Sequence, residues 1–511
     1  MKQILLCLCG LTVLVLISSC RNDFEFTESS GNLEFSQDTV YLDTVFSSIG
    51  SSTRTFKVYN RSNEDIIIPR VALAQGANSR YRLAVDGVPG QIFENVELLA
   101  KDSMYVFVET TVDITDFTND NQFLYEDRIE FDSGANLQQV ELVTLIQDAI
   151  FLFPERDAQG VTECILLGTT EDGEEICLSG FFLDNNELNF TNEKPYVIYG
   201  FAAVSPNQTL TIDPGARLYF HNRSGIIVAN EGSLKINGSL SMTESMENQV
   251  ILEGDRLEPE YADVAGQWFG IWLTAGSRDH ELDNVTIKNA SVGILMDSSN
   301  PASNGATLQI RNSQILNSAN SAIIASTADI SASNSIFHNA GQSTIVARLG
   351  GSYLFNNCTI TNYWSSSLRQ DPTLFLSNTI PNTDLTEPLS QALFRNCIIY
   401  GNRNLELGLL EASGTAFNYK LENTLLRFND FSNDFEGNPL YDFSNTSLFD
   451  NTVLNTDPAF EDPRSFLLRI DNSSGANGLA DPVTATATDI EGTMRGNTPD
   501  AGAFESTDLE N

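Results

Sequence analysis

The stretch LDNVTIKN, residues 282–289, returns five more times along the chain in altered form. The later copies are IRNSQILN (310–317), ASNSIFHN (332–339), FNNCTITN (355–362), FRNCIIYG (394–401) and LENTLLRF (421–428). Their lead asparagines are Asn284, Asn312, Asn334, Asn357, Asn396 and Asn423, so the copies start 28, 22, 23, 39 and 27 residues apart. The interval of 39 indicates one repeat with an insertion within 364–390, where Arg369-Gln370-Asp371-Pro372 breaks the pattern.

A period of 22–28 residues built from short strands, with no helix between them, predicts a parallel β-helix. A single coil cannot bury its apolar face, whereas stacked coils form one continuous core. Asparagine at each bend is suited to the left-handed conformation and to a hydrogen bond with the equivalent residue of the next coil. The six lead asparagines are therefore predicted to form a ladder. A leucine-rich repeat is the alternative, but its LxxLxLxxN signature is missing.

These repeats resemble the right-handed β-helix proteins of the pectate-lyase-like superfamily, over residues 191–505. The resemblance predicts a β-helix over 191–455 and a last coil and cap over 456–511. The segment DIEGTMRGNTPDAGAFE, which ends at Glu505, resembles the terminus of secreted β-helix proteins. We expect its charged residues to close the exposed edge of the last coil; they are Asp489, Arg495, Asp500 and Glu505.

Residues 31–150 have a different pattern: seven short runs in which apolar and polar residues alternate, such as STRTFKVYN and DSMYVFVETTV, are separated by turns. This pattern predicts an all-β sandwich. The arrangement resembles immunoglobulin-like modules, which implies a spacer or a binding platform and transfers no catalytic residue. The whole chain is thus predicted to be all-β.

The first 19 residues have the features of a signal peptide, because Lys2 precedes an apolar run that is too short for a comfortable membrane span. The segment LISSC (16–20) resembles a bacterial lipobox, which implies lipidation of Cys20. Residues 20–30 would then be a tether, in which Asp23 and Glu25 resemble an export tag for the outer face of the outer membrane. An ordinary secretory leader and a merely polar tether are the alternatives.

Four cysteines remain in the oxidising compartment that this leader implies. Cys164 and Cys177 flank an apolar run and a turn within residues 151–190, so we predict a connector closed by a disulfide. Cys358 and Cys397 occupy the same position of two repeats. We favour stacked free thiols, although that spacing also permits a disulfide.

The charge is strongly negative, with 28 Lys and Arg against 68 Asp and Glu and a formal net charge of −40. Such a surface repels phosphate backbones, so a nucleic acid partner is not expected. Hard oxygen ligands suit Ca²⁺. One acidic cluster is therefore a candidate calcium site, with a solvated acidic loop as the alternative; its members are Glu253, Asp255, Glu258, Glu260 and Asp263.

No catalytic motif of the superfamily is present. The chain has no Asp-Asp pair and no Gly-His-Gly, and its histidines (221, 280 and 338) are isolated in sequence. Candidates for stacking on sugars are Trp268, Trp272, Tyr363 and Trp364, with strand packing as the alternative. The sequence therefore favours a surface lipoprotein without catalysis, whose β-helix binds an extracellular polysaccharide or a surface protein. The alternative is a polysaccharide lyase or glycoside hydrolase.

Overall fold

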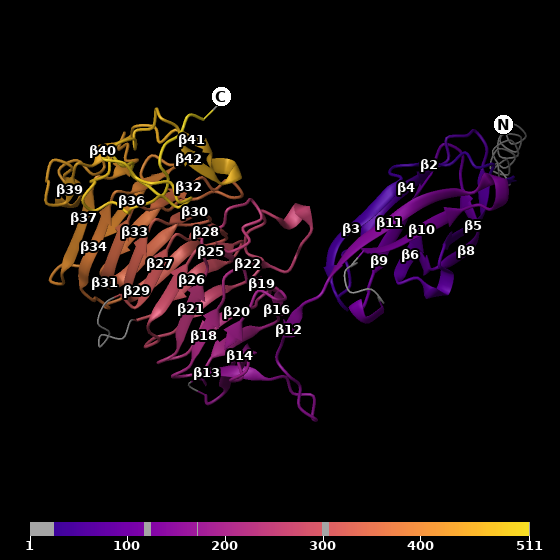
Figure 1. The fold of residues 1–511 in the computed structure, drawn as a ribbon, viewed down its shortest axis with the longest axis horizontal. Coiled ribbons are helices and arrows are strands. Elements are labelled where there is room, and N and C mark those ends of the chain that lie inside the picture. Colours follow the sequence, from indigo (N-terminus) through magenta and orange to yellow (C-terminus); the bar gives the residue numbers. More distant parts are fainter. Residues whose placement is uncertain (1–24, 117–123, 171, 299–305, 510–511) are drawn as a thin grey trace, which may run out of the picture. The chain divides into compact units, whose positions relative to one another are not determined.

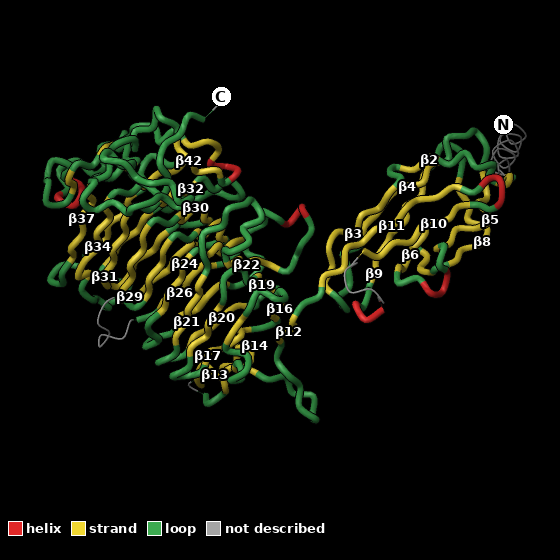
Figure 2. The backbone as a smooth tube through the Cα atoms, viewed as in Figure 1, coloured by secondary structure: helices red, strands yellow, loops and turns green. Residues whose placement is uncertain are grey.

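The computed structural model describes residues 25–116, 124–170, 172–298 and 306–509. The chain divides into two compact units, Met1–Asp148 and Ala149–Asn511. Regular structure in the described residues is almost all β (Figures 1 and 2). The helices are single 3₁₀ turns: η1 (Gly76–Asn78), η2 (Ile114–Asp116), η3 (Gly134–Asn136), η4 (Pro259–Tyr261), η5 (Pro439–Tyr441) and η6 (Pro463–Ser465). No helix of the described residues is long and apolar enough to cross a membrane.

The N-terminal unit is a sandwich of two sheets. One sheet has the order β1-β5-β10-β11-β3 with β8 beside β5; the strands are β1 (Thr27–Glu28), β3 (Thr39–Phe46), β5 (Ile66–Leu73), β8 (Ile92–Leu98), β10 (Leu124–Phe131) and β11 (Gln138–Gln147). The other has the order β2-β4-β9-β6-β7, with β2 (Glu34–Phe35), β4 (Arg54–Tyr59), β6 (Tyr81–Val85), β7 (Val88–Gly90) and β9 (Ser103–Thr110). Alternate residues of both sheets meet in one apolar core. The predicted sandwich is confirmed, whereas the immunoglobulin-like resemblance stays a prediction.

The C-terminal unit is a parallel β-helix, as the repeats predict (Figure 1). Its first face, which we call sheet 1, has 11 strands: β12 (Ile150–Leu152), β16 (Tyr196–Ile198), β19 (Arg217–Phe220), β22 (Val250–Gly254), β25 (Val285–Lys288), β28 (Gln314–Ser318), β30 (Ile336–Ala340), β32 (Thr359–Asn362), β35 (Ile398–Gly401), β38 (Leu425–Leu426) and β40 (Val453–Leu454). Each strand pairs in parallel with the strand one coil further along the chain.

In the described part of the unit, the other faces belong to one continuous sheet of 18 strands, which we call sheet 2. Its strands are β13 (Cys164–Thr169), β14 (Glu175–Phe182), β15 (Asn189–Phe190), β17 (Phe201–Val204), β18 (Thr209–Ile212), β20 (Gly225–Val228), β21 (Ser233–Asn237), β23 (Gly270–Leu273), β24 (His280–Asp283), β26 (Val292–Met296), β27 (Leu308–Arg311), β29 (Ser321–Ser333), β31 (Ile345–Asn356), β33 (Leu374–Ser377), β34 (Leu389–Arg395), β36 (Leu407–Leu410), β37 (Phe417–Glu422) and β39 (Phe449–Asp450). The long strands β29 and β31 each span two faces, with a register shift at Ser326/Ala328 in β29 and at Gly351/Ser352 in β31.

The core of the β-helix is built from stacked rows of apolar side chains. Because the strands stay in register, one position of each repeat points inward in every coil. One such row in sheet 1 runs through Leu218, Leu252, Ile287, Ile315, Phe337, Ile360, Ile399 and Leu426. The sixth residue of the repeat motif therefore contributes one row of the core, and the first residue of each copy, from Leu282 to Leu421, belongs to the same core.

The lead asparagines all adopt the left-handed conformation, with φ between 49° and 52°. Asn334 donates to Asn312 at 2.7 Å, as expected of a ladder. The expectation fails further along the chain. The side chains of Asn357 and Asn396 accept from the backbone N–H groups of Thr486 and Asp481, each at 2.9 Å, rather than binding one another.

These contacts belong to residues 456–509, which we call the C-terminal cover. It includes the hairpin of β41 (Phe460–Asp462) and β42 (Leu467–Ile470). Asp489, Arg495, Asp500 and Glu505 do come together, with Arg495 bonded to Glu505 at 2.5 Å and the Glu505 amide to Asp489 at 3.1 Å. They do not close the edge of the last coil, because the cover lies along the side of the helix, against the outer face of sheet 1. The prediction of an end cap is therefore wrong.

The reason is an apolar strip on the outside of sheet 1. Leu316, Ile336, Ile398, Tyr400 and Leu425 point away from the core and would meet water without the cover. They pack instead on apolar residues of the cover, which are Leu468, Ile470, Ala476, Leu479, Ile490, Ala501, Ala503 and Phe504. Burial of this strip fixes the cover to the side of the helix.

His338 lies beneath the cover with no exposed surface. One ring nitrogen contacts Thr361 Oγ1 at 2.8 Å and the other the carbonyl oxygen of Pro463 in the cover at 2.9 Å. Burial lowers the pKa of His338 from 6.5 to about 4. The folded state thus binds the proton more weakly than the unfolded state, so stability is lost as the pH falls from about 6.5 towards 4.

We expect the free energy of unfolding of the C-terminal unit to lose about 2–3 kcal/mol through His338 between pH 7.5 and pH 4.5. His338→Gln, which keeps a donor for Pro463, removes this contribution. Urea unfolding of both proteins at the two pH values measures it. An equal loss in wild type and variant would contradict the assignment.

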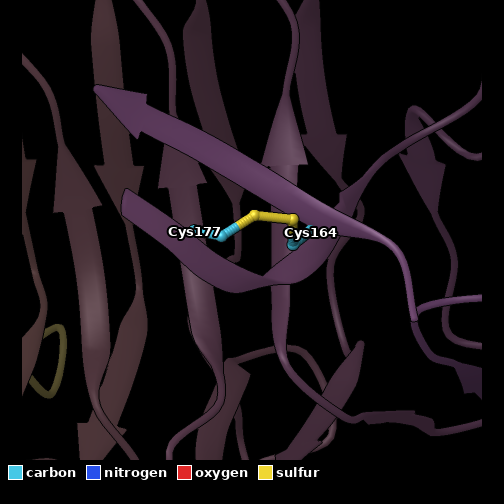
Figure 3. The surroundings of a disulfide bond; sticks show 2 residues. All are labelled: Cys164 and Cys177. Carbon is cyan, nitrogen blue, oxygen red and sulfur yellow. A yellow bond between two sulfur atoms is a disulfide. The ribbon is translucent and has the colours of Figure 1, made fainter. Parts of the chain in front are cut away.

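Cys164 and Cys177 form the predicted disulfide, with their Cα atoms 5.7 Å apart in the hairpin of β13 and β14 (Figure 3). The connector around them is not separate from the helix, since β12 pairs with β16 in sheet 1 and β14 with β17 in sheet 2. Cys358 and Cys397 are free thiols with no exposed surface. Burial raises the pKa of the Cys397 thiol, which donates to the carbonyl oxygen of Arg395.

Candidate functional site

The outer face of sheet 1 carries a groove between the loop 240–249 and the C-terminal cover. Its volume is about 590 Å³, and its walls are the loop 240–249 and the cover. Ile490 and Phe504 give an apolar floor, and Gln249 and Gln314 add two amides. This combination of apolar surface and a few polar groups, at this volume, is typical of a small-ligand site.

The loop that forms the first wall is held from below by Arg217. Its guanidinium donates to the carbonyl oxygens of Gln249 at 2.6 Å and Met246 at 2.8 Å. Glu247 closes the loop on itself by accepting from the Met242 amide and the Thr243 hydroxyl. These hydrogen bonds lower the pKa of Glu247 to about 2. The wall is therefore fixed in shape although it is a loop.

The second wall is the turn after η6. Phe466 has a φ of 64°, a left-handed conformation that is uncommon for a bulky side chain. Its ring packs edge-on against His338, with 5.5 Å between centroids. Arg469 and Glu491 form an exposed ion pair at 2.6 Å on the same rim. Strained backbone that lines a groove is a common feature of binding sites.

A second polar cluster lies on the same sheet in earlier coils. Tyr199, His221 and Asp255 each follow a strand of sheet 1 at the same position of three successive coils. His221 Nδ1 lies 2.7 Å from Asp255 Oδ2, and the Tyr199 ring stacks on the imidazole at 4.5 Å between centroids. The imidazole is half exposed, whereas the carboxylate is largely buried. An imidazole oriented by a buried carboxylate is a frequent proton-transfer arrangement.

Glu253 points to the same outer face two residues before Asp255. Burial raises the pKa of both carboxyl groups, and the neighbouring Tyr219 has a pKa raised to about 12 for the same reason. Two residues along a strand span about 6.6 Å. The two side chains therefore project from neighbouring positions of one outer face, and glycosidases use a pair of carboxyl groups that flank the scissile bond.

The predicted calcium cluster is not brought together as a cation site. Asp255 pairs with His221, Glu258 with Arg256 at 3.1 Å and Asp263 with Lys288 at 3.1 Å. Among the described residues, no group of three or more His, Cys, Asp or Glu side chains is placed to hold a metal ion. Each of these three carboxylates already has a cationic or imidazole partner, and calcium binding by the cluster stays a prediction.

The predicted stacking aromatics do not form a platform either. Trp268 is buried in the core and stacks on Phe220 at 4.2 Å, and Trp364 is buried too. Tyr363 packs edge-on against Phe460 of the cover. Trp272 is partly exposed and donates to Asp297 at 2.8 Å. Of the three predicted tryptophans, Trp272 is the one whose indole is partly exposed at the surface.

Sequence reasoning missed both the groove and the pairing of His221 with Asp255. The pair is 34 residues apart, which is one coil with a longer loop, so register counting between successive strands is the signal that finds it. The groove has no comparable signal, because its walls come from segments more than 200 residues apart.

Comparison with known proteins agrees with the fold. Residues 322–479 match a family model described as a right handed beta helix region. No curated protein sequence matches the chain.

Two solved structures are similar to parts of it. The crystal structure of the periplasmic chaperone SfaE is 13% identical, with 22% of this chain and 58% of that chain covered and a TM-score of 0.15. The catalytic domain of a GH87 alpha-1,3-glucanase in complex with nigerose is 9% identical, with 74% and 81% covered and a TM-score of 0.19. At these scores neither structure carries an argument about function. What the family match and the parallel coils show is that residues 322–479 are a right-handed β-helix region, within a β-helix that runs from β12 to β40.

Proposed function

We propose that this protein is a lipid-anchored β-helix protein of the outer membrane that binds an extracellular glycan in the groove on sheet 1. The observation that carries the proposal is the groove itself, with a wall held by Arg217, apolar lining residues and two glutamines. Sugars present C–H faces and hydroxyl groups together. The Phe466 ring can pack against the C–H face of a sugar, and the amides of Gln249 and Gln314 offer hydrogen-bond donors and acceptors for its hydroxyl groups.

The size of the groove favours a glycan over a protein partner. A stable protein interface buries about 800 Å² and about 20–30 residues on each side, whereas 16 residues line the groove. A short run of sugar units fits a volume in the usual range for small ligands.

Replacing Gln314 with alanine is expected to weaken glycan binding about tenfold, because the hydrogen bonds that its side-chain amide makes with the sugar are lost. Phe466→Ala should weaken it by a similar factor. Binding of residues 21–511 to a polysaccharide panel, followed by calorimetry on the best ligand, measures both. The matched control is Gln391→Ala, an exposed glutamine on β34 of sheet 2, which should bind as wild type does. Unchanged binding in both groove variants would refute the assignment.

A second candidate function is glycoside hydrolysis, which is favoured by two carboxyl groups with raised pKa on one face, Glu253 and Asp255, with Asp255 bonded to His221. One carboxyl with a raised pKa would protonate the leaving oxygen, while the other would activate water. The same panel scored for release of reducing ends tests it. If reducing ends are released and Asp255→Asn abolishes their release, hydrolysis is supported. If none are released, hydrolysis is refuted and glycan binding is unaffected.

The anchor is proposed on the sequence, because residues 1–24, including Cys20 and Asp23, lie outside the described residues; Glu25, next to them, is exposed. We expect Cys20→Ala to lose lipid labelling and to leave the membrane fraction, since the lipid is the proposed attachment. Cys9→Ala, within the leader, should keep both. Protease treatment of whole cells then reports whether the protein faces the exterior, as Asp23 and Glu25 suggest. Membrane retention of the unlabelled Cys20→Ala protein would contradict the anchor.

A further inference from the structure

The rim of the groove is acidic. Glu244 lies on the loop wall, and Glu461 and Glu491 lie on the cover; all three side chains are exposed at the mouth. The cation among the lining residues is Arg469, which is already paired with Glu491. Three carboxylates against one guanidinium leave the lining with a charge of 1 − 3 = −2.

The charges just behind the loop wall do not offset this. Arg217 lies under the loop with its guanidinium bound to backbone carbonyls, and Glu247 of the same loop carries the opposite charge. The chain as a whole has a formal net charge of −40, so the long-range field has the same sign as the rim. Uronic acids and sulfated sugars would therefore be repelled from the groove.

We infer that the groove selects glycans that carry free amino groups, such as polymers of glucosamine, over neutral and acidic glycans. This inference rests on the proposed glycan binding at the same site. An ammonium group gives carboxylates a charge-assisted hydrogen bond, which is about twice as strong as a neutral one. The Phe466 ring, held by its left-handed backbone at the wall, adds a favourable surface for a cation. The apolar floor formed by Ile490 and Phe504 accommodates the face of the sugar ring.

The test compares three hexasaccharides by calorimetry on residues 21–511 at low salt. They are β-1,4-linked glucosamine, the same chain N-acetylated, and galacturonate. We expect the glucosamine hexamer to bind at least tenfold more tightly than the N-acetylated hexamer, and galacturonate to bind weakest. Because exposed charges are screened by salt, this ratio should fall by at least half at 0.5 M NaCl.

A triple variant assigns the preference to the rim. Glu244→Gln, Glu461→Gln and Glu491→Gln together should bring the ratio of the two affinities close to one. The matched control changes three exposed glutamates away from the groove, with Glu155→Gln, Glu163→Gln and Glu175→Gln. It alters the net charge by the same amount and should keep the preference.

The outcomes separate the two proposals. If none of the three hexasaccharides and no other glycan binds, the proposed function fails. If the N-acetylated hexamer binds as tightly as the glucosamine hexamer, or galacturonate binds more tightly, the inference fails and glycan binding stands. A pentalysine peptide that binds as tightly as the glucosamine hexamer would also overturn the inference, because charge alone would then suffice.

Discussion

Replacing Arg495 with alanine is expected to lower the free energy of unfolding of the C-terminal unit by about 3–5 kcal/mol, because it leaves buried carboxyl groups without their cation. The Arg495 side chain is 2% exposed and bonds Glu505 at 2.5 Å. It also donates to the carbonyl oxygens of Asp500 at 3.0 Å and Gly502 at 2.9 Å. A further bond to Asn334 at 3.3 Å connects the cover to the helix.

The three tryptophans of the chain, at positions 268, 272 and 364, all lie in the C-terminal unit, so indole fluorescence during urea unfolding follows that unit alone. The matched control is Arg469→Ala in the same cover, whose ion pair with Glu491 is exposed and should contribute at most about 1 kcal/mol. An Arg495 variant as stable as the Arg469 variant would show that the polar cluster does not hold the cover.

Glu406→Ala should be about as damaging, with a loss of about 3–5 kcal/mol, since it leaves the Arg369 guanidinium buried and unpaired. Arg369 donates to both carboxylate oxygens of Glu406, and neither side chain is more than 2% exposed. The same carboxylate accepts from the backbone amides of Thr373 and Arg403. It therefore fixes the insertion after residue 364 to the following coil.

Urea unfolding again measures the effect, and Glu422→Ala is the control. Glu422 pairs with Lys420 and Arg395 on the outside of sheet 2 and should contribute about 1 kcal/mol or less. The double variant Arg369→Met with Glu406→Leu removes both charges and should regain at least half of the loss. A double variant less stable than Glu406→Ala would contradict the view that the unpaired charge is the cause.

The fold of the C-terminal unit was predictable because its contacts are periodic. Register places the equivalent residue of each coil at the same position, so a pattern such as LDNVTIKN states both the inward residue and the bend. The cover was not predictable as a lateral layer, because Arg495 and Asn334 meet across 161 residues without any repeat to align them.

A local signal for the cover does exist in the repeats. Strands such as IIYG (398–401) and IFHN (336–339) begin with successive apolar residues. In a strand with one solvent-exposed face, apolar and polar residues would alternate instead. Both faces had to be buried, and only one could be buried by the core. The buried Trp268 was ambiguous for a different reason. Four of the five residues of WFGIW (268–272) are large and apolar, and strict alternation would put both tryptophans on one face, whereas Trp268 is buried and Trp272 is partly exposed.

The lateral cover has a consequence for biogenesis. Contacts between neighbouring coils join residues about one repeat apart, so coils can add to one another as the chain emerges. The cover closes contacts as distant as His338 with Pro463 and Asn334 with Arg495, and it is synthesised after every strand that it shields. Until then the apolar strip of sheet 1 stays open to water and to other chains. We therefore expect the protein to be most prone to aggregation at the stage when its coils are complete and residues 456–509 are not yet docked.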